Sequence, residues 1–298
     1  MFALLIPMAH IVNSGQISYN FQIHFRHFGL DAWAQFEKPC ANGTKLLILT
    51  MSRREGFDSR RGIRTWMKDA LAGEELRFLI AGPGKDEADD VQQQLVNEQK
   101  EHGDLVLMHG FVDVYAHLHI KMYSGFVWQQ RHCAGAEWVL KVDDDIAVHV
   151  RRMVEWTEKK FGKMAIEHAL IYFGVSADRG LSRDKNSKWY VPYEMFPGEH
   201  FPPFLYGGCY LTTPSTIKAV LEQAHKTDSF YLEDVLYTGI LAELANVTVS
   251  DQLSHFYGNG LQFECVDRLP TPFAVWNTDN GNETVRYYEE LKKMSCEH

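Results

Sequence analysis

The chain of 298 residues is 45% hydrophobic, 13% aromatic and 23% charged. This composition is that of a folded globular protein, and it excludes a disordered, a collagen-like or a small disulfide-stapled chain. With 30 basic and 39 acidic residues the net charge is −9, which argues against general nucleic-acid binding, because phosphate contacts need clustered lysine and arginine. One phosphorylated ligand stays compatible with this charge if a bound metal ion neutralises it.

The N-terminal residues 1–12, MFALLIPMAHIV, are apolar but too short for a membrane-spanning helix, which needs about 20 residues. They also lack the basic start of a signal peptide. Three interpretations stay open: a poor signal sequence, a membrane anchor absent from this chain, or a buried N-terminal element. We assign residues 1–43 to a stem or capping segment, which could be the remnant of an anchor, and residues 44–298 to one domain.

From Lys45 onward, short apolar runs alternate with longer amphipathic stretches. The runs, predicted as strands, are 46–51, 76–81, 104–108, 137–142 and 169–175. The stretches, predicted as helices, are near 59–71, 86–101, 115–131 and 149–161. Near-continuous apolar strands separated by such helices indicate βαβ units, so we predict an α/β fold with a mostly parallel central sheet flanked by helices. Such sheets bind ligands at the carboxyl ends of their strands.

The second half of the chain is less regular. Residues 176–205 form a long polar, aromatic and proline-containing loop, and loops of this length are usually functional or mobile. Its aromatic side chains could pack on the core or face a polar ligand. The segment 206–213, YGGCYLTT, predicts a turn that leads into a strand, and Pro214 and Glu233 each predict the start of a helix. Residues 251–298 allow no clear assignment.

The five cysteines form no CxxC pair, which argues against a structural zinc site. They allow up to two disulfides and one free thiol, and the sequence leaves the pairing open. Asn-x-Thr sequons begin at Asn42, Asn246 and Asn282. Since about one or two sequons are expected by chance in a chain of this length, they support a secretory compartment only weakly.

The triplet Asp143-Asp144-Asp145 directly follows the apolar run WVLKV. Side chains alternate along an extended strand, so Asp143 and Asp145 should point to one side and Asp144 to the other. Adjacent carboxylates repel one another unless a cation or hydrogen-bond donors lie among them. At the carboxyl end of a central parallel strand, the triplet predicts a hard divalent metal such as Mg²⁺ or Mn²⁺, bound through oxygen. The alternative is a solvated acidic turn.

Two further segments carry candidate chemistry. Glu233-Asp234 starts an amphipathic helix, where the helix dipole and free backbone N–H groups favour carboxylates and keep them ionised, as a general base requires. Residues 59–66, SRRGIRTW, follow the first strand, and arginine forks at such a helix start suit phosphate oxygens. The alternatives are an ordinary helix cap for the acidic pair and a cationic helix face for the arginines.

Taken together, and in this order, these segments resemble glycosyltransferase family 31, the β-1,3-galactosyltransferases and β-1,3-N-acetylglucosaminyltransferases. The resemblance extends from about Lys45 to about Val249. It rests on RRGIRTW (60–66), GFVDVYAHLHIKMYSGFVW (110–128), KVDDD (141–145), KWYVPYEMFPGEHFPPFLYGGCYL (188–211) and EDVLYTG (233–239). Several segments in the right order are far more specific than a lone DxD motif.

The resemblance implies a GT-A-type, Rossmann-like α/β fold that binds a UDP-sugar and manganese. It implies that Asp145 ligates the metal on the diphosphate, that Asp143 lies near the nucleotide ribose, and that Asp234 is the general base. The other residues that it assigns to donor binding are Arg60 and Arg64 near UDP, Asp144 of the same triplet, and Gly207 and Gly208 in the sugar pocket.

Some positions depart from the family's pattern. The chain has one residue fewer between Arg64 and Trp66 than the family's IRxTW, which on an α-helix would rotate the tryptophan by about 100°. Family members often supply a metal-binding histidine near the C-terminus, where this chain reads FAVWN over 273–277. Asn277 is therefore the nearest candidate metal ligand, through a weaker oxygen donor, and His255 is a second candidate.

The main functional prediction is an inverting, metal-dependent hexosyltransferase that forms a β-1,3 linkage on a glycan of a glycoprotein or glycolipid. UDP-galactose is the preferred donor, since residues 188–204 are closer to the galactosyl branch, and UDP-N-acetylglucosamine is the second choice. The family further implies a protein of the Golgi membrane with type II topology and a lumenal catalytic domain, although no anchor is evident in this chain.

Two other hypotheses come from different classes of protein. The missing histidine, and Tyr206 where the family has serine, suggest a catalytically weak relative that acts as a lectin-like or chaperone binding protein. The presence of both Asp145 and Asp234 argues against it, because a binding protein needs no general base. A metal-dependent phosphohydrolase using the same aspartates is the third hypothesis, and the chain contains no recognisable nucleophile motif for it.

Overall fold

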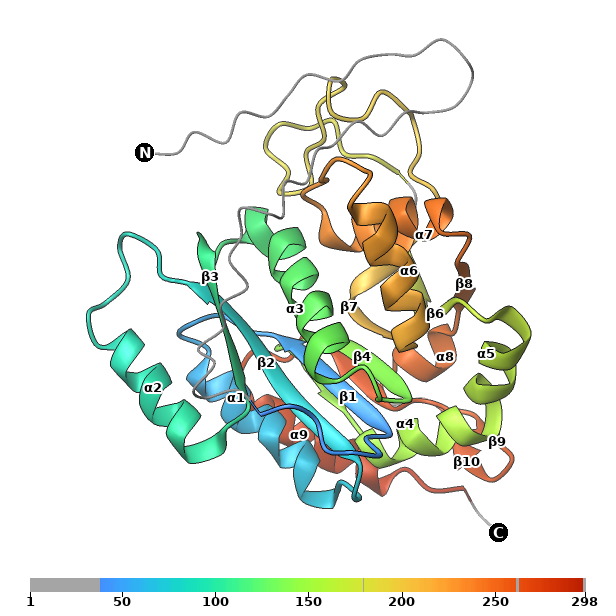
Figure 1. Cartoon of the computed structure of the whole chain (residues 1–298). Helices are drawn as coiled ribbons and strands as arrows, with labels where there is room; N and C mark the ends of the chain where they lie inside the picture. The colour runs from blue at the N-terminus through green and yellow to red at the C-terminus, as the bar shows by residue number, and fades with distance from the viewer. Residues whose placement is uncertain (1–37, 179, 261–262, 297–298) are drawn as a thin grey trace.

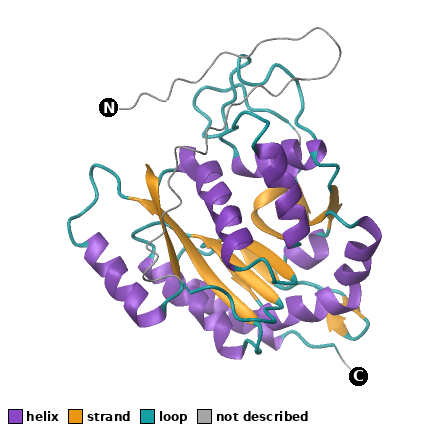
Figure 2. Ribbon diagram, in the orientation of Figure 1, coloured by secondary structure: helices purple, strands orange, loops and turns teal. Residues whose placement is uncertain are grey.

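The computed structural model describes residues 38–178, 180–260 and 263–296. The predicted stem or cap, residues 1–43, lies outside the described residues except for 38–43. The described part is an α/β fold in which a seven-stranded sheet lies between two layers of helices (Figure 1, Figure 2). It confirms the predicted fold class and is consistent with the GT-A-type, Rossmann-like arrangement that the resemblance implies.

The sheet is mostly parallel, with the strand order β3-β2-β1-β4-β7-β6-β8. Its strands are β1 (Leu46–Met51), β2 (Glu74–Gly82), β3 (Leu105–Val112), β4 (Trp138–Asp143), β6 (Ile171–Ser176), β7 (Leu205–Thr212) and β8 (Thr248–Asp251). The pairs β1–β2, β1–β4, β2–β3 and β6–β8 are parallel. Strand β7 runs antiparallel to both β4 and β6, so it alone is reversed in this sheet.

The two faces of the sheet support two hydrophobic cores. Along β1, Leu47 and Leu49 belong to one core, and Leu46 and Ile48 belong to the other, because side chains of a strand alternate between its faces. The first core lies under α3 (Leu118–His132), α6 (Pro214–Ala224), the π-helical segment Val235–Ile240 and α7 (Leu241–Leu244). The second lies under α1 (Phe57–Ile63), α2 (Val91–His102), α4 (Val150–Trp156), α5 (Gly162–His168), α8 (Leu253–Phe256) and α9 (Gly281–Lys293).

The C-terminal segment returns to the carboxyl end of β4. Strand β5 (Ile146–Val148) follows the aspartate triplet and pairs antiparallel with β11 (Ala274–Trp276). Helix α9 then packs against α1, and two glycines allow the close approach: a Cβ atom on Gly62 would lie 2.5 Å from the carbonyl oxygen of Gly281. The segment that had no clear assignment from sequence thus forms one wall beside the triplet. A small hairpin, β9 (Cys265–Val266) and β10 (Leu269–Pro270), lies further out.

Helix α1 ends earlier than the sequence predicts. The predicted helix near 59–71 is α-helical only to Ile63 and continues as a tighter 3₁₀ turn over Arg64–Asp69. A 3₁₀ turn rotates each residue by more than an α-helix does, and Trp66 is fully buried in this turn. The spacing that is one residue short therefore still directs the tryptophan into the core.

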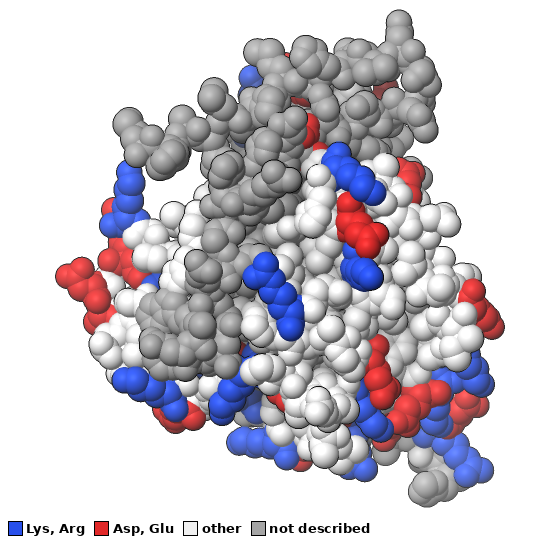
Figure 3. All heavy atoms as spheres, in the orientation of Figure 1, with Lys and Arg blue, Asp and Glu red and all other residues white. Residues whose placement is uncertain are grey.

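Two disulfides join the described cysteines as Cys40–Cys133 and Cys265–Cys296, and Cys209 is a buried free thiol. This settles the pairing that the sequence left open. On the face drawn in Figure 3, acidic and basic side chains are intermixed, and the described residues form no continuous basic patch there. Within the described ranges, none of the helices combines the length and the apolar character that a membrane span requires.

Candidate active site

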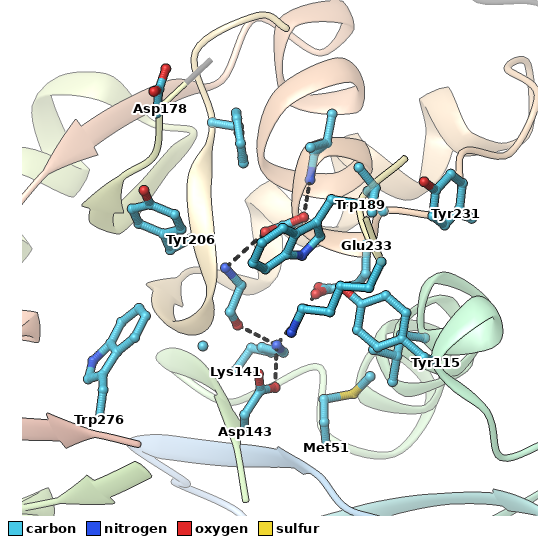
Figure 4. Close-up of a pocket in the computed structure, with 18 of the residues that line it drawn as sticks. Met51, Tyr115, Lys141, Asp143, Asp178, Trp189, Tyr206, Tyr231, Glu233 and Trp276 are labelled. Carbon is cyan, nitrogen blue, oxygen red and sulfur yellow. Dashed lines mark hydrogen bonds and ion pairs between the residues drawn. The ribbon is translucent and has the colours of Figure 1, made fainter. Parts of the chain in front are cut away.

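A cavity of about 560 Å³ opens at the carboxyl ends of the central strands (Figure 4). Its wall includes Met51 at the end of β1, Asp143 at the end of β4 and Gly207 in β7. Asp234 borders it at the start of the π-helical segment, and Trp276 borders it from β11. This is where open α/β sheets bind their ligands, and the volume suits a small organic molecule.

The cavity is strongly acidic. The carboxylates among its described lining residues are Asp143, Asp145, Asp178, Glu233 and Asp234. The basic residues among them are Lys141 and Lys188. A concave site with unbalanced like charges is unfavourable in isolation and favours a bound cation, so the cavity is a candidate functional site on electrostatic grounds alone.

Asp145 and Asn277 lie together on one wall. Their strands pair with Ile146 opposite Trp276, and the backbone N–H of Thr278 donates to the Asp145 carbonyl at 2.7 Å. Asn277 adopts φ = 63°, a left-handed conformation that asparagine tolerates better than most residues. Burial, and then the charges of the neighbouring aspartates, raise the pKa of the Asp145 carboxyl to about 6, and a cation there would reverse this effect.

The donor atoms of this wall suit a hard divalent cation. Among the described residues that line the cavity there is no histidine and no cysteine, so the available ligands are oxygens. The described residues contain no cluster of three or more His, Cys, Asp or Glu side chains arranged to hold a metal ion. Asp145 and Asn277 therefore fit an ion that completes its shell with phosphate oxygens and water, as Mg²⁺ and similar ions do in nucleotide sites.

His255, the second metal-ligand candidate, lies elsewhere. Its ring packs edge-on against Trp156, with 4.5 Å between ring centroids, and against Phe161. This apolar environment lowers the pKa of His255 to about 4. The residue is buried in the second core and does not line the cavity.

The aspartates of the triplet divide between two sides. The carboxylate of Asp143 accepts a hydrogen bond from Lys141 Nζ at 2.6 Å and faces the cavity. Asp144 does not line the cavity, and its Oδ2 accepts from Ser52 Oγ at 3.0 Å. Asp143 and Asp145 therefore share one side, and Asp144 takes the other.

Asp234 lines the same cavity from the residue that precedes the π-helical segment. Its Oδ1 accepts from the backbone N–H of Val235 at 2.9 Å, and its Oδ2 accepts from that of Gly207 at 3.3 Å. Burial raises the pKa of the Asp234 carboxyl, and these two N–H groups oppose the rise. A side chain at position 207 would meet Asp234, since a Cβ atom there would lie 3.1 Å from the Asp234 Cβ. The glycine thus allows the carboxylate to approach the strand backbone.

Gly208 and Glu233 complete the far side of the cavity. At Gly208 a Cβ atom would lie 2.8 Å from the indole ring of Trp276, so the glycine lets that ring lie against β7. The buried carboxylate of Glu233 accepts from Tyr210 Oη at 2.9 Å and pairs with Lys141 Nζ at 3.4 Å. Burial raises the pKa of Glu233 to about 7.

The two arginines of the basic segment do not line the cavity. Arg60 is fully buried, and its guanidinium binds both carboxylate oxygens of Glu98, at 2.8 and 2.7 Å. Arg64 binds both oxygens of Asp104, at 2.7 and 2.8 Å. Arg60 also donates to Ser52 Oγ at 3.1 Å, the same hydroxyl that binds Asp144. Arg60 therefore supports the loop after β1, since it also donates to the backbone carbonyls of Arg53 and Arg54, whereas Arg64 holds Asp104 and Glu98.

Some aromatic residues of the long loop 176–205 pack in the core, and others face the cavity or solvent. Phe196, Phe201 and Phe204 are buried in the first core, and Phe201 and Phe204 also reach the cavity wall. Trp189 is 54% exposed and lines the cavity, and Tyr193 is exposed.

Lys141 lines the cavity and was not singled out in the sequence analysis. The signal for it was present: a lysine interrupts an otherwise apolar, fully buried strand two positions before the triplet. Tyr115 and Lys188 also line the cavity and were not singled out. Nothing in their local sequence distinguishes them from surface residues.

Comparison with known proteins identifies the family. Residues 58–252 match the sequence profile of the family described as Galactosyltransferase. The human lactosylceramide 1,3-N-acetyl-beta-D-glucosaminyltransferase is 27% identical over 75% of this chain and 60% of its own length. The human acetylgalactosaminyl-O-glycosyl-glycoprotein beta-1,3-N-acetylglucosaminyltransferase is 30% identical over 76% of this chain and 59% of its own. Human beta-1,3-galactosyltransferase 1 is 30% identical over 65% of this chain and 59% of its own.

The chain thus spans about 60% of the length of these relatives. Among solved structures, a 4-diphosphocytidyl-2C-methyl-D-erythritol synthase from Anaerococcus prevotii DSM 20548 matches 70% of this chain and 87% of its own, with a TM-score of 0.37 and 12% identity. A likeness at that level says nothing about function. The profile match covers more than half of the sequence, and the chain belongs to the galactosyltransferase family, glycosyltransferase family 31.

Proposed function

We propose that this chain is an inverting, metal-dependent hexosyltransferase that moves galactose, or N-acetylglucosamine, from a UDP-sugar to a glycan hydroxyl in β-1,3 linkage. The observation that carries the proposal is the shared cavity: Asp145 and Asn277 line one wall, and Asp234 lies on another. Transfer with inversion needs a base on the face opposite the leaving group, so the two functions must come from different elements that border one space.

In this proposal Asp234 removes the proton from the acceptor hydroxyl. Its raised pKa makes it a better proton acceptor than an exposed aspartate, and the two backbone N–H groups keep its carboxylate in a fixed orientation. Asp145 and Asn277 would hold a divalent cation such as Mn²⁺. That cation, when bound, would stabilise the negative charge that develops on the departing diphosphate.

The acceptor is proposed to be a glycan on a glycoprotein or glycolipid. The names of the relatives support this class, since one acts on lactosylceramide and another on a glycoprotein O-glycan. The exposed rings of Tyr115, Trp189 and Tyr206 also border the cavity. Aromatic faces suit the apolar faces of sugar rings, while nearby carboxylates can accept hydrogen bonds from sugar hydroxyls.

The Golgi membrane, with a lumenal catalytic domain, is proposed as the location. Two disulfides support an oxidising compartment, because such bonds persist mainly in secretory and extracellular proteins. The three sequon asparagines, Asn42, Asn246 and Asn282, are all exposed. Secretory expression should yield a chain whose mass falls on enzymatic removal of N-glycans, and an unglycosylated chain confined to the cytosol would contradict this location.

A donor screen tests the proposed function. UDP release and product formation are measured with a panel of UDP-sugars, with and without galactose-terminated acceptors, in the presence of Mn²⁺ and again after chelation. We expect transfer from UDP-galactose that stops when the metal is removed. A folded chain that turns over none of the donors would favour the alternative of a lectin-like or chaperone binding protein.

A further inference from the structure

Lys141 is an unusual residue for its place in the fold. It lies in the middle of β4, between the fully buried Leu140 and Val142, and is itself 2% exposed. A lysine in the centre of a mixed sheet is destabilising unless its ammonium group finds partners, because burial of an unpaired charge is strongly unfavourable. The ammonium group of Lys141 must therefore have charged or polar partners within the protein.

The ammonium group of Lys141 connects three separate segments (Figure 4). It donates to Asp143 Oδ1, at 2.6 Å, and to the carbonyl oxygen of Gly207 on β7. It also pairs with Glu233 Oε2, at 3.4 Å, immediately before the proposed base. One side chain thus links the end of β4, the glycine strand and the acidic pair.

Lys141 is also the buried counter-charge of the cavity. Asp143 and Glu233 contact it, and the charge of Asp234 adds to theirs. These carboxylates outweigh the effect of burial and raise the pKa of Lys141, so it stays charged. The other lysine among the described lining residues, Lys188, is exposed and lies over the ring of Trp189.

Lys141 and Asp234 are connected through Gly207, which hydrogen-bonds to both of them. The carbonyl oxygen of Gly207 accepts from Lys141, and the N–H of Gly207 donates to Asp234 Oδ2. The adjacent Glu233 is held on one side by Lys141 and on the other by the Tyr210 hydroxyl. The ammonium group of Lys141 therefore holds both neighbours of the Asp234 carboxylate, Gly207 and Glu233.

We propose that Lys141 is a positioning residue for transfer: it ties Asp143 to Gly207 and Glu233 and so fixes the carboxylate of Asp234 relative to the donor site. This inference rests on the function proposed above. Lys141 is nearly inaccessible and acts through its partners. The effect is substantial because a displacement of about 1 Å at a reacting group can lower a rate by about 100-fold.

The test begins with Lys141→Met, which keeps much of the chain length and removes the charge. We expect kcat, normalised to folded sites counted by UDP titration, to fall about 100-fold, and to fall much more than the donor KM rises. A purely structural role would reduce the number of folded sites and leave kcat per site unchanged. Lys141→Arg, which keeps the charge, should recover part of the lost kcat.

Lys121 provides a matched control. It is also buried, and its ammonium group binds a carboxylate, Asp113, and the carbonyl of Ser52, but it does not line the cavity. Lys121→Met should lower the melting temperature to a similar extent and leave kcat per folded site within about threefold of the wild type. An equal loss of kcat per site in both variants would overturn a specific role for Lys141.

A double variant separates positioning from charge balance, and it also serves if Lys141→Met folds poorly. Lys141→Met with Glu233→Gln removes one positive and one negative charge, so the net charge is that of the wild type. We expect the melting temperature to recover and kcat per site to stay low, because Asp143 and Gly207 still lack their partner. Recovery of both quantities would overturn the positioning role while the wild type remains active. A wild type that transfers no sugar would instead overturn the proposed function together with this inference.

Discussion

Two clusters of charged residues lie near the aspartate triplet, and they are balanced in different ways. Behind the loop after β1, Arg60 binds both oxygens of Glu98, and Arg64 binds both oxygens of Asp104. In the cavity, by contrast, carboxylates outnumber lysines among the described lining residues. The first cluster is balanced within the protein, whereas the second has more carboxylates than lysines to balance them, which is why we propose a bound cation there.

This difference separates structural charges from functional ones. A bidentate pair that is buried on both sides stabilises the fold and has no free valence for a ligand. Unbalanced carboxylates in an open cavity have raised pKa values, as Asp145 and Asp234 do, and raised values are frequent where groups bind metals or move protons. The comparison predicts that substitutions in the cavity change turnover, and that substitutions in the arginine cluster change stability.

The largest effect is expected at Asp234. Asp234→Asn keeps the size of the side chain and removes the proton acceptor, so kcat for transfer should fall by roughly 10³-fold. UDP binding, measured by calorimetry, should remain close to that of the wild type, because in the proposed function Asp234 acts on the acceptor and not on the nucleotide. Normal turnover in Asp234→Asn would show that another residue is the base. It would also show that an excess carboxylate in this cavity is not evidence of a catalytic role.

Arg60 belongs to the arginine cluster, and there we expect a loss of stability and not of UDP binding. Arg60→Met leaves the buried carboxylate of Glu98 with Arg64 as its remaining partner, and breaking a buried pair from one side destabilises by up to about 3–5 kcal/mol. Urea unfolding should show this loss, while the affinity of the folded fraction for UDP stays unchanged. A specific loss of UDP affinity would instead support the nucleotide-side role that the family resemblance implies for Arg60.

The next predictions concern Asp145 and Asn277, the proposed metal ligands. Asp145→Asn should weaken the binding of UDP in the presence of Mn²⁺ by about 10- to 100-fold and leave metal-free UDP binding unchanged. Asn277→His should act in the opposite direction, because it restores the histidine that the family resemblance leads us to expect near this position. Calorimetric titrations with UDP, with and without Mn²⁺, measure both. Metal-dependent binding that is normal in Asp145→Asn would remove this residue as a ligand.

The sequence predicts the parallel part of the fold well because its signal is local. The run LLILTM coincides with β1, and the triplet begins at the last residue of β4, at the carboxyl end of the parallel strands, where such sheets bind ligands. Asp143 and Asp145 line the cavity and Asp144 does not, as alternation along a strand predicts, although Asp144 and Asp145 lie in the turn between β4 and β5. No knowledge of distant segments is needed for these features.

The parts that could not be predicted depend on contacts between distant segments. Strand β5 has three residues and pairs with β11, which lies more than 120 residues later in the chain. The partner of Arg60 is Glu98 on α2, and no local pattern indicates that pairing. The role of Lys141 was likewise hidden, because two of its partners are distant in sequence: Gly207 on β7 and Glu233, which precedes Asp234.

The smallest predicted effect concerns His255, a titratable residue on the structural side of the comparison. Its pKa is about 4 in the folded chain and near 6.5 when exposed. Between these values the unfolded chain binds a proton that the folded chain does not, so stability is complete above pH 6.5 and falls as the pH drops toward 4. His255→Phe removes this loss and keeps an aromatic ring beside Trp156 and Phe161.

Relative to the wild type, the His255→Phe variant should gain about 1 kcal/mol in the free energy of unfolding for each pH unit below 6, measured by urea titration at several pH values. Any packing difference is independent of pH and cancels in this comparison. Transfer activity at neutral pH should be unchanged, because the ring does not line the cavity. A loss of Mn²⁺-dependent UDP binding in this variant would bring His255 into the metal site and would break the separation between the two kinds of charge.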